Sequence, residues 1–245
     1  MLKISIITAC FNNESTIKKC LDSVSQQSYD VEHILIDGLS TDGTIDIIKS
    51  YPHVAFFSSE KDAGIYDALN KGLEVATGDI IGFLHSDDVF CSNDILKQVG
   101  LFFQNDQSLD AIYGDIQFVD TNGKKVRYYS SRKFKNHDFS KGKMPAHTSF
   151  FARKKVYDAY NFKLGYQIAA DFDHLLRVFL SERYNISYKP ILTTYMMTGG
   201  ASTKNIRSRI IINKEILRSC RENGLKTNLV KVYSKYLHKF FEFKL

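Results

Sequence analysis

The chain has 245 residues, which fits one large domain or one domain with a tail. Hydrophobic residues make up 44% and charged residues 24%, the balance of a globular protein whose core needs no disulfide or metal to hold it together. The four cysteines are scattered without zinc-binding spacing, so we expect reduced thiols in a cytoplasmic protein.

Hydropathy and charge also limit how the chain can meet a membrane. Polar residues follow its short apolar start too soon for a signal peptide, and no apolar run approaches the ~20 residues of a spanning helix. The net charge of +6 is concentrated in residues 201–245, which hold 11 Lys and Arg against 3 Asp and Glu, whereas the rest of the chain holds 22 against 24. This argues against a nucleic-acid-binding core and indicates a basic tail that meets an anionic partner.

Strand and helix patterns alternate over the first half of the chain. Short apolar runs bounded by polar residues predict buried strands at 3–8, 32–36, 54–58 and 80–84. Apolar residues at helical spacing predict helices at 14–27, 44–49, 64–76 and 94–105. This alternation predicts a mostly parallel sheet with helices on both faces.

The pattern changes in the second half of the chain. Asn122-Gly123 predicts a hairpin turn between strands at 111–119 and 125–129. Residues 130–145 are polar and irregular, which predicts a mobile loop. Beyond them the pattern predicts a strand, a helix, a strand and a flexible loop at 148–152, 171–180, 186–194 and 198–203. Two basic helical stretches follow.

Polar side chains follow three of the four predicted parallel strands. Asn12 follows the first strand, Asp37 follows the second, and Asp87-Asp88 follows the fourth. Ligands bind at the carboxyl ends of the strands in sheets of this kind, so we expect these residues to belong to one site.

The adjacent carboxylates of Asp87 and Asp88 are costly at a strand end unless a positive charge neutralises them. A hard divalent cation, Mn²⁺ or Mg²⁺, would do so with oxygen ligands, and Mg²⁺ usually sits on one or two carboxylates plus substrate phosphates. The alternative is a solvated turn in which an Asp caps the next helix, and for the pair alone that alternative is favoured.

The motifs around the acidic pair reverse that preference. Residues 59–72 (SEKDAGIYDALNKG), followed by Thr77-Gly78-Asp79 and the pair, closely resemble family 2 glycosyltransferases, above all the bacterial enzymes that build O-antigen and other surface polysaccharides. The segments 8–12 (TACFN) and 36–44 (IDGLSTDGT) resemble two further motifs of that family. The resemblance is dense over about the first 90 residues and resumes at Ala146-His147-Thr148 and Ala170-Asp171-Phe172-Asp173.

The resemblance implies a GT-A fold, an inverting and metal-dependent reaction, and a nucleotide-diphospho-sugar donor, most often a UDP-sugar. It places Asp37 against the base or ribose of the nucleotide, Asp87 near the ribose, and Asp88 on the metal that binds the diphosphate. The remaining donor-binding candidates come from the first motif and from a helix start, namely Ala9, Phe11, Asn12 and Asp67. For Asp67, a first-turn carboxylate that the helix dipole favours is an equal alternative.

Asp171 matches the catalytic base of the family. In a single inverting displacement, one base takes the proton of the acceptor hydroxyl while the metal acts as a Lewis acid on the departing diphosphate. Without the resemblance, Asp171 would be interpreted as an ordinary helix N-cap. Asp173 is a second candidate, but the family motif aligns on Asp171, and Asp173 points elsewhere on the helix.

The chain departs from the family pattern at three positions and in one motif. Leu39 stands where the family usually has Gly, Gly38 where many members have a second Asp, and Ala170 where a Glu often precedes the base. The Gln-x-x-Arg-Trp motif of processive synthases is absent, and the chain has no Trp. These features favour the transfer of one sugar per acceptor over processive polymerisation.

Further candidates for contacts with phosphate or acceptor are His147, Ser202 and Lys204. For His147, such a role and a structural role are equally supported, while His85 fits a supporting role better than that of a metal ligand. The loop that contains Gly199-Gly200, Ser202 and Lys204 would suit closure over a diphosphate, because backbone N–H groups and a cation bind phosphate. The alternative is a plain surface loop.

Residues 229–245 have the pattern of an amphipathic basic helix, which is typical of an interfacial membrane segment. Its expected apolar face comprises Leu229, Tyr233, Tyr236, Leu237, Phe240 and Phe241. The family's lipid-linked acceptors favour peripheral contact with the inner face of the plasma membrane. The alternative is a helix that packs on the domain with its lysines in solvent.

These features predict a GT-A catalytic domain at 1–205, with a nucleotide-sugar-binding half (1–115), an acceptor-side half (116–205) and basic helices at 206–245. The expected reaction moves one sugar from a UDP-sugar or similar donor to a hydroxyl of a lipid-linked saccharide in surface polysaccharide synthesis. The alternatives are a metal-dependent nucleotidyltransferase and a non-catalytic nucleotide-sugar-binding or membrane-adaptor protein. The chain lacks a P-loop for the first, and its full set of acidic residues disfavours the second. We expect no nucleic-acid partner, because motifs for base stacking are missing.

Overall fold

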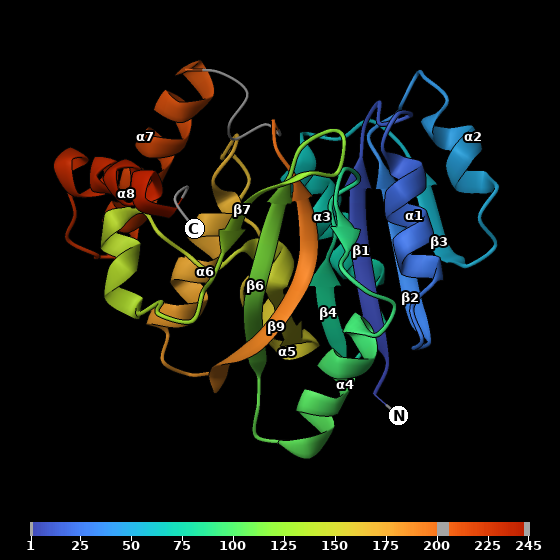
Figure 1. Ribbon diagram of the computed structural model, residues 1–245, viewed down its shortest axis with the longest axis horizontal. Coiled ribbons are helices and arrows are strands. Elements are labelled where there is room, and N and C mark those ends of the chain that lie inside the picture. The colour runs from blue at the N-terminus through green and yellow to red at the C-terminus, as the bar shows by residue number, and fades with distance from the viewer. Residues whose placement is uncertain (1, 200–205, 243–245) are drawn as a thin grey trace.

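The computed structural model describes residues 2–199 and 206–242, with side chains as far as Tyr236. Within them one sheet forms the centre of the molecule, and helices cover both of its faces (Figure 1). The strands run in the order β3-β2-β1-β4-β8-β6-β9-β5, and β7 pairs with β6. The strands are β1 (Ile4–Cys10), β2 (Val31–Asp37), β3 (Val54–Ser59), β4 (Ile80–Phe83), β5 (Val89–Phe90), β6 (Ala111–Val119), β7 (Lys125–Tyr129), β8 (Phe150–Arg153) and β9 (Ile186–Met197). The helices are α1 (Ile17–Ser25), α2 (Thr44–Lys49), α3 (Ile65–Val75), α4 (Ile95–Asn105), α5 (Lys154–Ala159), α6 (Ala170–Leu180), α7 (Ile206–Glu222) and α8 (Leu229–Glu242), with short 3₁₀ helices η1 (Asn136–Lys141) and η2 (His147–Ser149).

The first four strands pair in parallel, as the alternation of strands and helices predicts. Strand β1 pairs with β2 from Ile4 opposite Val31 to Cys10 opposite Asp37, and Asp37 in turn pairs with Ser59 at the end of β3. Strand β4 flanks the other side of β1. The carboxyl ends of β1, β2 and β3 therefore lie level with one another along one edge of the sheet.

Strand β1 is buried along its whole length, and its side chains alternate between two hydrophobic layers. Ile4 and Ile6 pack in a cluster with α1 and α4, while Ile7 and Ala9 pack in a cluster with α3, α5 and α6 on the opposite face. Burial of one such Ile side chain stabilises the fold by about 1.5–3 kcal/mol. The central position of β1 fixes the loop that follows it.

The second half of the sheet is mixed. Strand β8 runs antiparallel to both β4 and β6, whereas β9 runs parallel to β6 and antiparallel to β5. The sequence patterns predict neither β5 nor α5. Two residues are too few for a periodic pattern, and the short α5 follows β8 directly, without the turn and cap residues that precede the equally short α2 at 40–43. Strands β6 and β7 form the hairpin predicted at Asn122-Gly123, where Gly123 has a φ of 79° and donates its N–H to the Asp120 carbonyl at 2.9 Å.

The segment 130–145 is not the irregular loop that its polar composition predicts. It contains η1, and the side chain of Phe139 in η1 is fully buried. The Phe139 ring meets those of Phe134, Phe172 and Phe179 edge to face, at centroid distances of 5.1, 5.5 and 5.5 Å. Two aromatic residues among polar neighbours are enough to anchor the segment, and a composition average conceals them.

The C-terminal helices pack on the side of the domain that α6 and η1 form (Figure 1). Ile216 and Cys220 of α7 and Val232 of α8 are buried in the larger hydrophobic cluster. Of the expected apolar face of 229–245, Leu229 and Tyr233 are 55% and 46% exposed, and Tyr236 is half-buried. The side chains of the other three members lie outside the part of the chain that the structure describes: Leu237, Phe240 and Phe241. Among the described helices, none combines the length and apolar composition that crossing a bilayer requires.

Candidate active site

The loops that follow β1 and β2 are tied together through Asn12. Its backbone N–H donates to Ser40 Oγ at 2.8 Å, and its Oδ1 accepts a hydrogen bond from the Thr41 N–H at 2.9 Å. Asn12 and Leu39 have φ angles of 53° and 67°, in the left-handed region. Asn enters this region more readily than Leu, and glycine enters it most readily, so Leu39 holds a backbone conformation that a glycine would adopt with less strain.

The carboxylate of Asp37 holds these loops together through hydrogen bonds. Asp37 is fully buried, and it accepts hydrogen bonds from the Ser40 N–H at 2.9 Å, from Ser59 Oγ at 2.6 Å and from Ser40 Oγ. The thiol of Cys10 lies 3.6 Å from its Oδ1. Asp37 thus connects the ends of β1, β2 and β3, and its oxygens are already engaged by the protein.

Two large apolar side chains just past the ends of β1 and β2 face solvent. Phe11 is 58% exposed and Leu39 is 52% exposed, while Ala9 is buried. A Cβ on Gly38 would come within 2.7 Å of Asp62 Oδ2 and within 3.4 Å of the Phe11 ring, so a larger residue there would displace the Asp62 carboxylate but not the ring. Asp62 therefore lies at this edge as well, although the sequence patterns single it out only as part of the segment 59–72.

The acidic pair differs in exposure. Asp87 is half-buried, whereas Asp88 is 1% exposed and accepts a hydrogen bond from the Met197 N–H at 3.1 Å through Oδ1. Its Oδ2 is buried and has no hydrogen-bond partner among the described residues. Burial raises the pKa of Asp88 well above its ordinary value, and the neighbouring charge of Asp87 raises it further. A cation bound at Oδ2 would offset both the cost of burying the Asp88 charge and its repulsion by Asp87.

The residues around Asp88 fit a cation site for which the protein supplies only some of the ligands. Within 2–199 and 206–236, no three side chains of the types that bind metals gather into a complete site. Mg²⁺ and Mn²⁺ accept such a site when substrate phosphate and water supply the other oxygen ligands. The unpaired Asp88 Oδ2, with Asp87 beside it, is the donor set expected for that arrangement.

Two neighbouring histidines, His85 and His147, lie near the acidic pair. His147, in η2, is 5% exposed, stacks on Phe83 at a centroid distance of 5.0 Å and lies 5.9 Å from the His85 ring. Burial lowers the pKa of His147 well below its ordinary value, and the neighbouring His85 and His174 lower it further, so the ring is neutral. Neither of its nitrogens finds a partner in the part of the chain that the structure describes.

Asp171 lies in the first turn of α6, where the sequence places it, and is partly exposed. Its Oδ1 accepts a hydrogen bond from the Phe172 N–H at 2.7 Å and lies 3.5 Å from the Tyr66 hydroxyl. Burial raises the pKa of Asp171 from 3.8 to about 6, and the charge of Glu215 adds to the effect, against the opposing hydrogen bonds. A carboxylate with this pKa suits proton abstraction near neutral pH.

Asp173, the other acid in the first turn of α6, has different surroundings. Its side chain is fully buried, and it accepts hydrogen bonds from Arg177 Nε at 2.7 Å and Ser219 Oγ at 2.8 Å. Tyr166 and Asn223 donate to the same carboxylate at 3.3 and 3.2 Å. These contacts make Asp173 a link between α6 and α7, so the geometry favours Asp171 as the carboxylate that can meet a substrate.

Aromatic contacts connect the acidic pair to Asp171. The His147 ring meets the Phe162 ring at 5.5 Å, and Phe162 stacks on Tyr66 at 5.8 Å. The hydroxyl of Tyr66 donates to the Ile168 carbonyl, three residues before Asp171. The structure therefore brings η2, α3 and the start of α6 to one region, although these segments are about 100 residues apart at the extremes.

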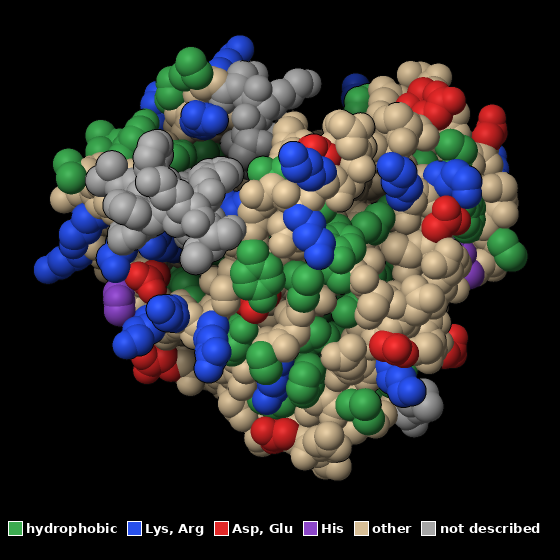
Figure 2. Space-filling view, in the orientation of Figure 1, with side chains coloured by type: hydrophobic (Ala, Val, Ile, Leu, Met, Phe, Trp, Pro, Cys, Tyr) green, Lys and Arg blue, Asp and Glu red, His purple; other side chains and the backbone are tan. Residues whose placement is uncertain are grey.

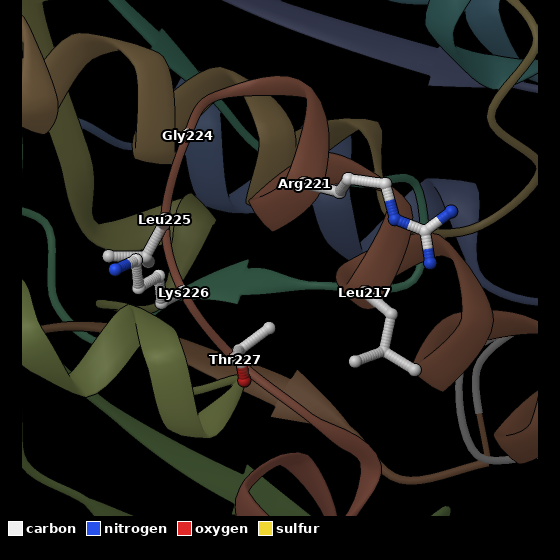
Figure 3. A pocket seen from close by; sticks show the side chains of 6 residues that line it. All are labelled: Leu217, Arg221, Gly224, Leu225, Lys226 and Thr227. Atoms are coloured by element: carbon white, nitrogen blue, oxygen red, sulfur yellow. The ribbon is translucent and has the colours of Figure 1, made fainter.

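The other residues expected at the site, Asp67, Ser202 and Lys204, are either engaged in contacts within the chain or outside the described residues. Asp67 accepts a hydrogen bond from the Ala63 N–H at 3.0 Å and lies 3.5 Å from Lys71 Nζ, so its carboxylate is engaged at the start of α3. Ser202 and Lys204 lie outside the described residues. A pocket of about 280 Å³ at the end of α7 has none of the candidate residues in its lining (Figure 3). That pocket is lined by Leu217, Arg221, Gly224, Leu225, Lys226 and Thr227.

Solved structures share the fold. The structure of S. aureus TarS 1-349 in complex with UDP-GlcNAc matches with a TM-score of 0.67 at 21% identity, over 80% of this chain and 59% of that chain. Mannosyltransferase PcManGT from Pyrobaculum calidifontis, in complex with GDP-Man and Mn²⁺, matches with a TM-score of 0.67 at 18% identity, over 90% and 63%. The chain thus spans less than two thirds of either solved chain, and the likeness confirms the GT-A fold.

Sequence comparisons give the family. The model of Glycosyl transferase family 2 matches residues 5–160. A PGL/p-HBAD biosynthesis glycosyltransferase of Mycobacterium bovis is 31% identical over 222 residues, which cover 87% of this chain and 82% of the relative. An uncharacterized glycosyltransferase of Mycobacterium tuberculosis is 32% identical over 194 residues, covering 72% and 69%. The chain therefore belongs to glycosyl transferase family 2.

Proposed function

We propose that the protein transfers one sugar from a nucleotide-diphospho-sugar to a hydroxyl group, with inversion and with a divalent cation bound at Asp88. The observation that carries this proposal is the buried, unpaired Oδ2 of Asp88 beside Asp87. Such an oxygen is unfavourable in the free protein and becomes favourable when a cation and a diphosphate complete the site.

The donor would lie across the ends of β1 and β2. The exposed Phe11 and Leu39 offer apolar contact to a nucleobase, and Asp62 offers a hydrogen-bond acceptor beside them. Ala9 and Asn12 would contribute backbone at the same edge, while Asp37 would act by holding the loops rather than by a free oxygen. Asp87 would face the ribose. UDP-GlcNAc and GDP-Man in the solved relatives support a sugar nucleotide without selecting one.

Asp171 would act on the acceptor side of the sugar. The acceptor oxygen attacks the anomeric carbon, the bond to the diphosphate oxygen breaks, and the hydroxyl proton passes to an Asp171 oxygen. A bound Mn²⁺ or Mg²⁺ would supply Lewis-acid stabilisation of the departing diphosphate. The neutral ring of His147, expected from the sequence as a possible contact to phosphate or acceptor, would support this region from within, because both of its nitrogens are buried and the ring packs on Phe83 and Phe162.

The acceptor is proposed to be a saccharide carried on a lipid, reached from the membrane surface. Exposed apolar side chains lie on α7 and α8, with Ile206 at 75%, Leu229 at 55% and Val230 at 80% exposure. Basic and apolar side chains stand side by side around α7 (Figure 2). This combination fits an anionic bilayer surface. In this proposal the enzyme works as a peripheral protein on the cytoplasmic leaflet.

Nucleotide binding is the first test of the donor site. Calorimetric titration with UDP, with and without Mn²⁺, should show binding that depends on the metal and disappears in Asp88→Asn. Titrations with GDP, dTDP and CMP would follow if UDP gave no heat. Failure of all four nucleotides with the metal present would reject the donor site and, with it, the proposed reaction.

A further inference from the structure

One carboxylate of α7 holds the backbone just before the proposed base. Glu215 accepts a hydrogen bond from the Gln167 N–H at 2.6 Å through Oε1, and from the Ile168 and Ala169 N–H groups at 2.9 Å each through Oε2. The residue is 9% exposed. Three consecutive backbone donors on one buried carboxylate form strong, charge-assisted hydrogen bonds with a fixed geometry.

The same short segment is held from its other side by α3. The Tyr66 hydroxyl donates to the Ile168 carbonyl and lies 3.5 Å from Asp171 Oδ1. Ala169 is the residue that precedes α6, and Asp171 is the second residue of that helix. Residues 167–169 are thus fixed between Glu215 and Tyr66, and the direction of the Asp171 side chain depends on them.

We propose that Glu215 is a positioning residue for Asp171, through which the C-terminal helix α7 sets the geometry of the base. The inference rests on the proposed function, because it assigns Glu215 a task in the transfer step. The hydrogen bonds of Glu215 go to the backbone N–H groups of residues 167–169, and it would act on Asp171 through that backbone. The C-terminal segment is therefore part of the catalytic apparatus as well as a surface for other contacts.

The charge of Glu215 provides a signature that a purely structural role would not produce. The ionisable groups that face Asp171 from neighbouring elements are Tyr66 on α3 and Glu215 on α7, and Asp173 lies on its own helix. The negative charge of Glu215 contributes to the raised pKa of Asp171. Its removal should therefore move the acidic limb of the pH–rate profile to lower pH.

The experiment compares Glu215→Gln with Glu222→Gln in the full chain. Glu222 lies on the same helix, but its carboxylate pairs with the side chains of Arg218 and Lys163 and accepts a hydrogen bond from the Tyr166 hydroxyl at 3.2 Å, rather than from the backbone of residues 167–169. For Glu215→Gln we expect kcat to fall roughly ten- to a hundredfold, as for a misplaced catalytic group, while the nucleotide Kd stays unchanged. The midpoint of the acidic limb of the pH–rate profile should fall below about 6. Glu222→Gln should keep the kcat and midpoint of the unchanged protein.

Glu215→Asp and hydrogen exchange separate the outcomes. Glu215→Asp keeps the charge but shortens the reach, so kcat should fall while the midpoint stays near 6. The amides of residues 167–169 should exchange at least about tenfold faster in Glu215→Gln, whether or not the protein transfers sugar. Unchanged exchange at these amides, or an active variant with unchanged kcat and midpoint, would overturn the role of Glu215. An unchanged protein that binds no donor and transfers nothing would instead reject the proposed function.

Discussion

Asp88 and Asp171 both have a raised pKa, and the surroundings of each give that shift a different consequence. Asp88 is almost completely buried, its Oδ2 has no partner among the described residues, and the neighbouring Asp87 repels its charge. The ionised carboxylate of Asp88 is therefore stabilised when a cation binds to it. Asp171 is partly exposed and keeps two hydrogen-bond donors nearby, so its charge can form and can accept a proton. Proton transfer and cation binding are therefore separable by mutation.

The pH dependence of transfer follows from Asp171. Because the base must be ionised and its pKa is about 6, kcat should rise with pH through that value and level off above it. In Asp171→Glu, kcat should still rise with pH but level off at a lower value, since the carboxylate remains but its position changes. A rate that is flat between pH 5 and 7 would contradict this assignment of the base.

The buried charge of Asp88 predicts a gain in stability when it is removed. In the absence of metal, Asp88→Asn should raise the free energy of unfolding by about 1–3 kcal/mol at neutral pH, because it removes an unpaired buried carboxylate. The folded pKa is raised, so the unchanged protein gains stability as pH falls through that pKa, and the difference should shrink in acid. Thermal unfolding at several pH values, with and without Mn²⁺, measures this; Mn²⁺ with donor nucleotide should stabilise only the unchanged protein.

At the scale of elements, sequence patterns locate segments that carry their own signal. Helix α2 has the predicted bounds, and the strands of the parallel half differ from prediction by one or two residues. Motifs also indicate Asp88 and Asp171. Asp62 and Glu215 escape sequence reasoning, because their importance depends on contacts with Gly38 and with residues 167–169. Local periodicity contains no information about contacts between segments so far apart.

The anchoring of η1 by Phe139 also depends on contacts between distant segments, and it can be tested. Phe139→Ala should lower the free energy of unfolding by about 3–5 kcal/mol, because it empties a fully buried site lined by aromatic rings. Phe56→Ala is the matched control, since Phe56 is 39% exposed on β3 and should cost less than about 1.5 kcal/mol. Urea denaturation compares the two. Equal losses would mean that η1 is not fixed by Phe139.

At the scale of the whole molecule, the proposed site joins the two ends of the chain. The proposed donor site lies at the ends of strands β1 to β4, and the proposed base Asp171 lies on α6. Glu215 of α7 holds the backbone of residues 167–169, just before that base. Helix α8 packs through Val232, while Leu229 and Tyr233 remain exposed. The hydrophobic pattern predicted an amphipathic helix but could not tell which face would be covered, because Val232 and Leu229 are equally apolar in sequence.

The exposed face of α8 predicts binding to bilayers. Leu229→Ser combined with Val230→Ser should weaken binding to anionic vesicles by roughly tenfold or more, because both side chains are largely exposed and free to enter the interface. Leu101→Ser provides the control, since Leu101 is 44% exposed on α4. Vesicle sedimentation gives the affinities. Equal binding of all three proteins would remove this face from the proposed membrane contact.

The most direct measurement follows sugar transfer and nucleotide binding side by side in the unchanged protein, Asp88→Asn and Asp171→Asn. Asp88→Asn should lose metal-dependent nucleotide binding and transfer together. Asp171→Asn should bind nucleotide and Mn²⁺ with unchanged affinity but transfer sugar roughly 10²–10⁴ times more slowly, because only proton abstraction is lost. Normal transfer by Asp171→Asn would contradict the assignment of the base, and normal Mn²⁺-dependent binding by Asp88→Asn would contradict that of the cation site.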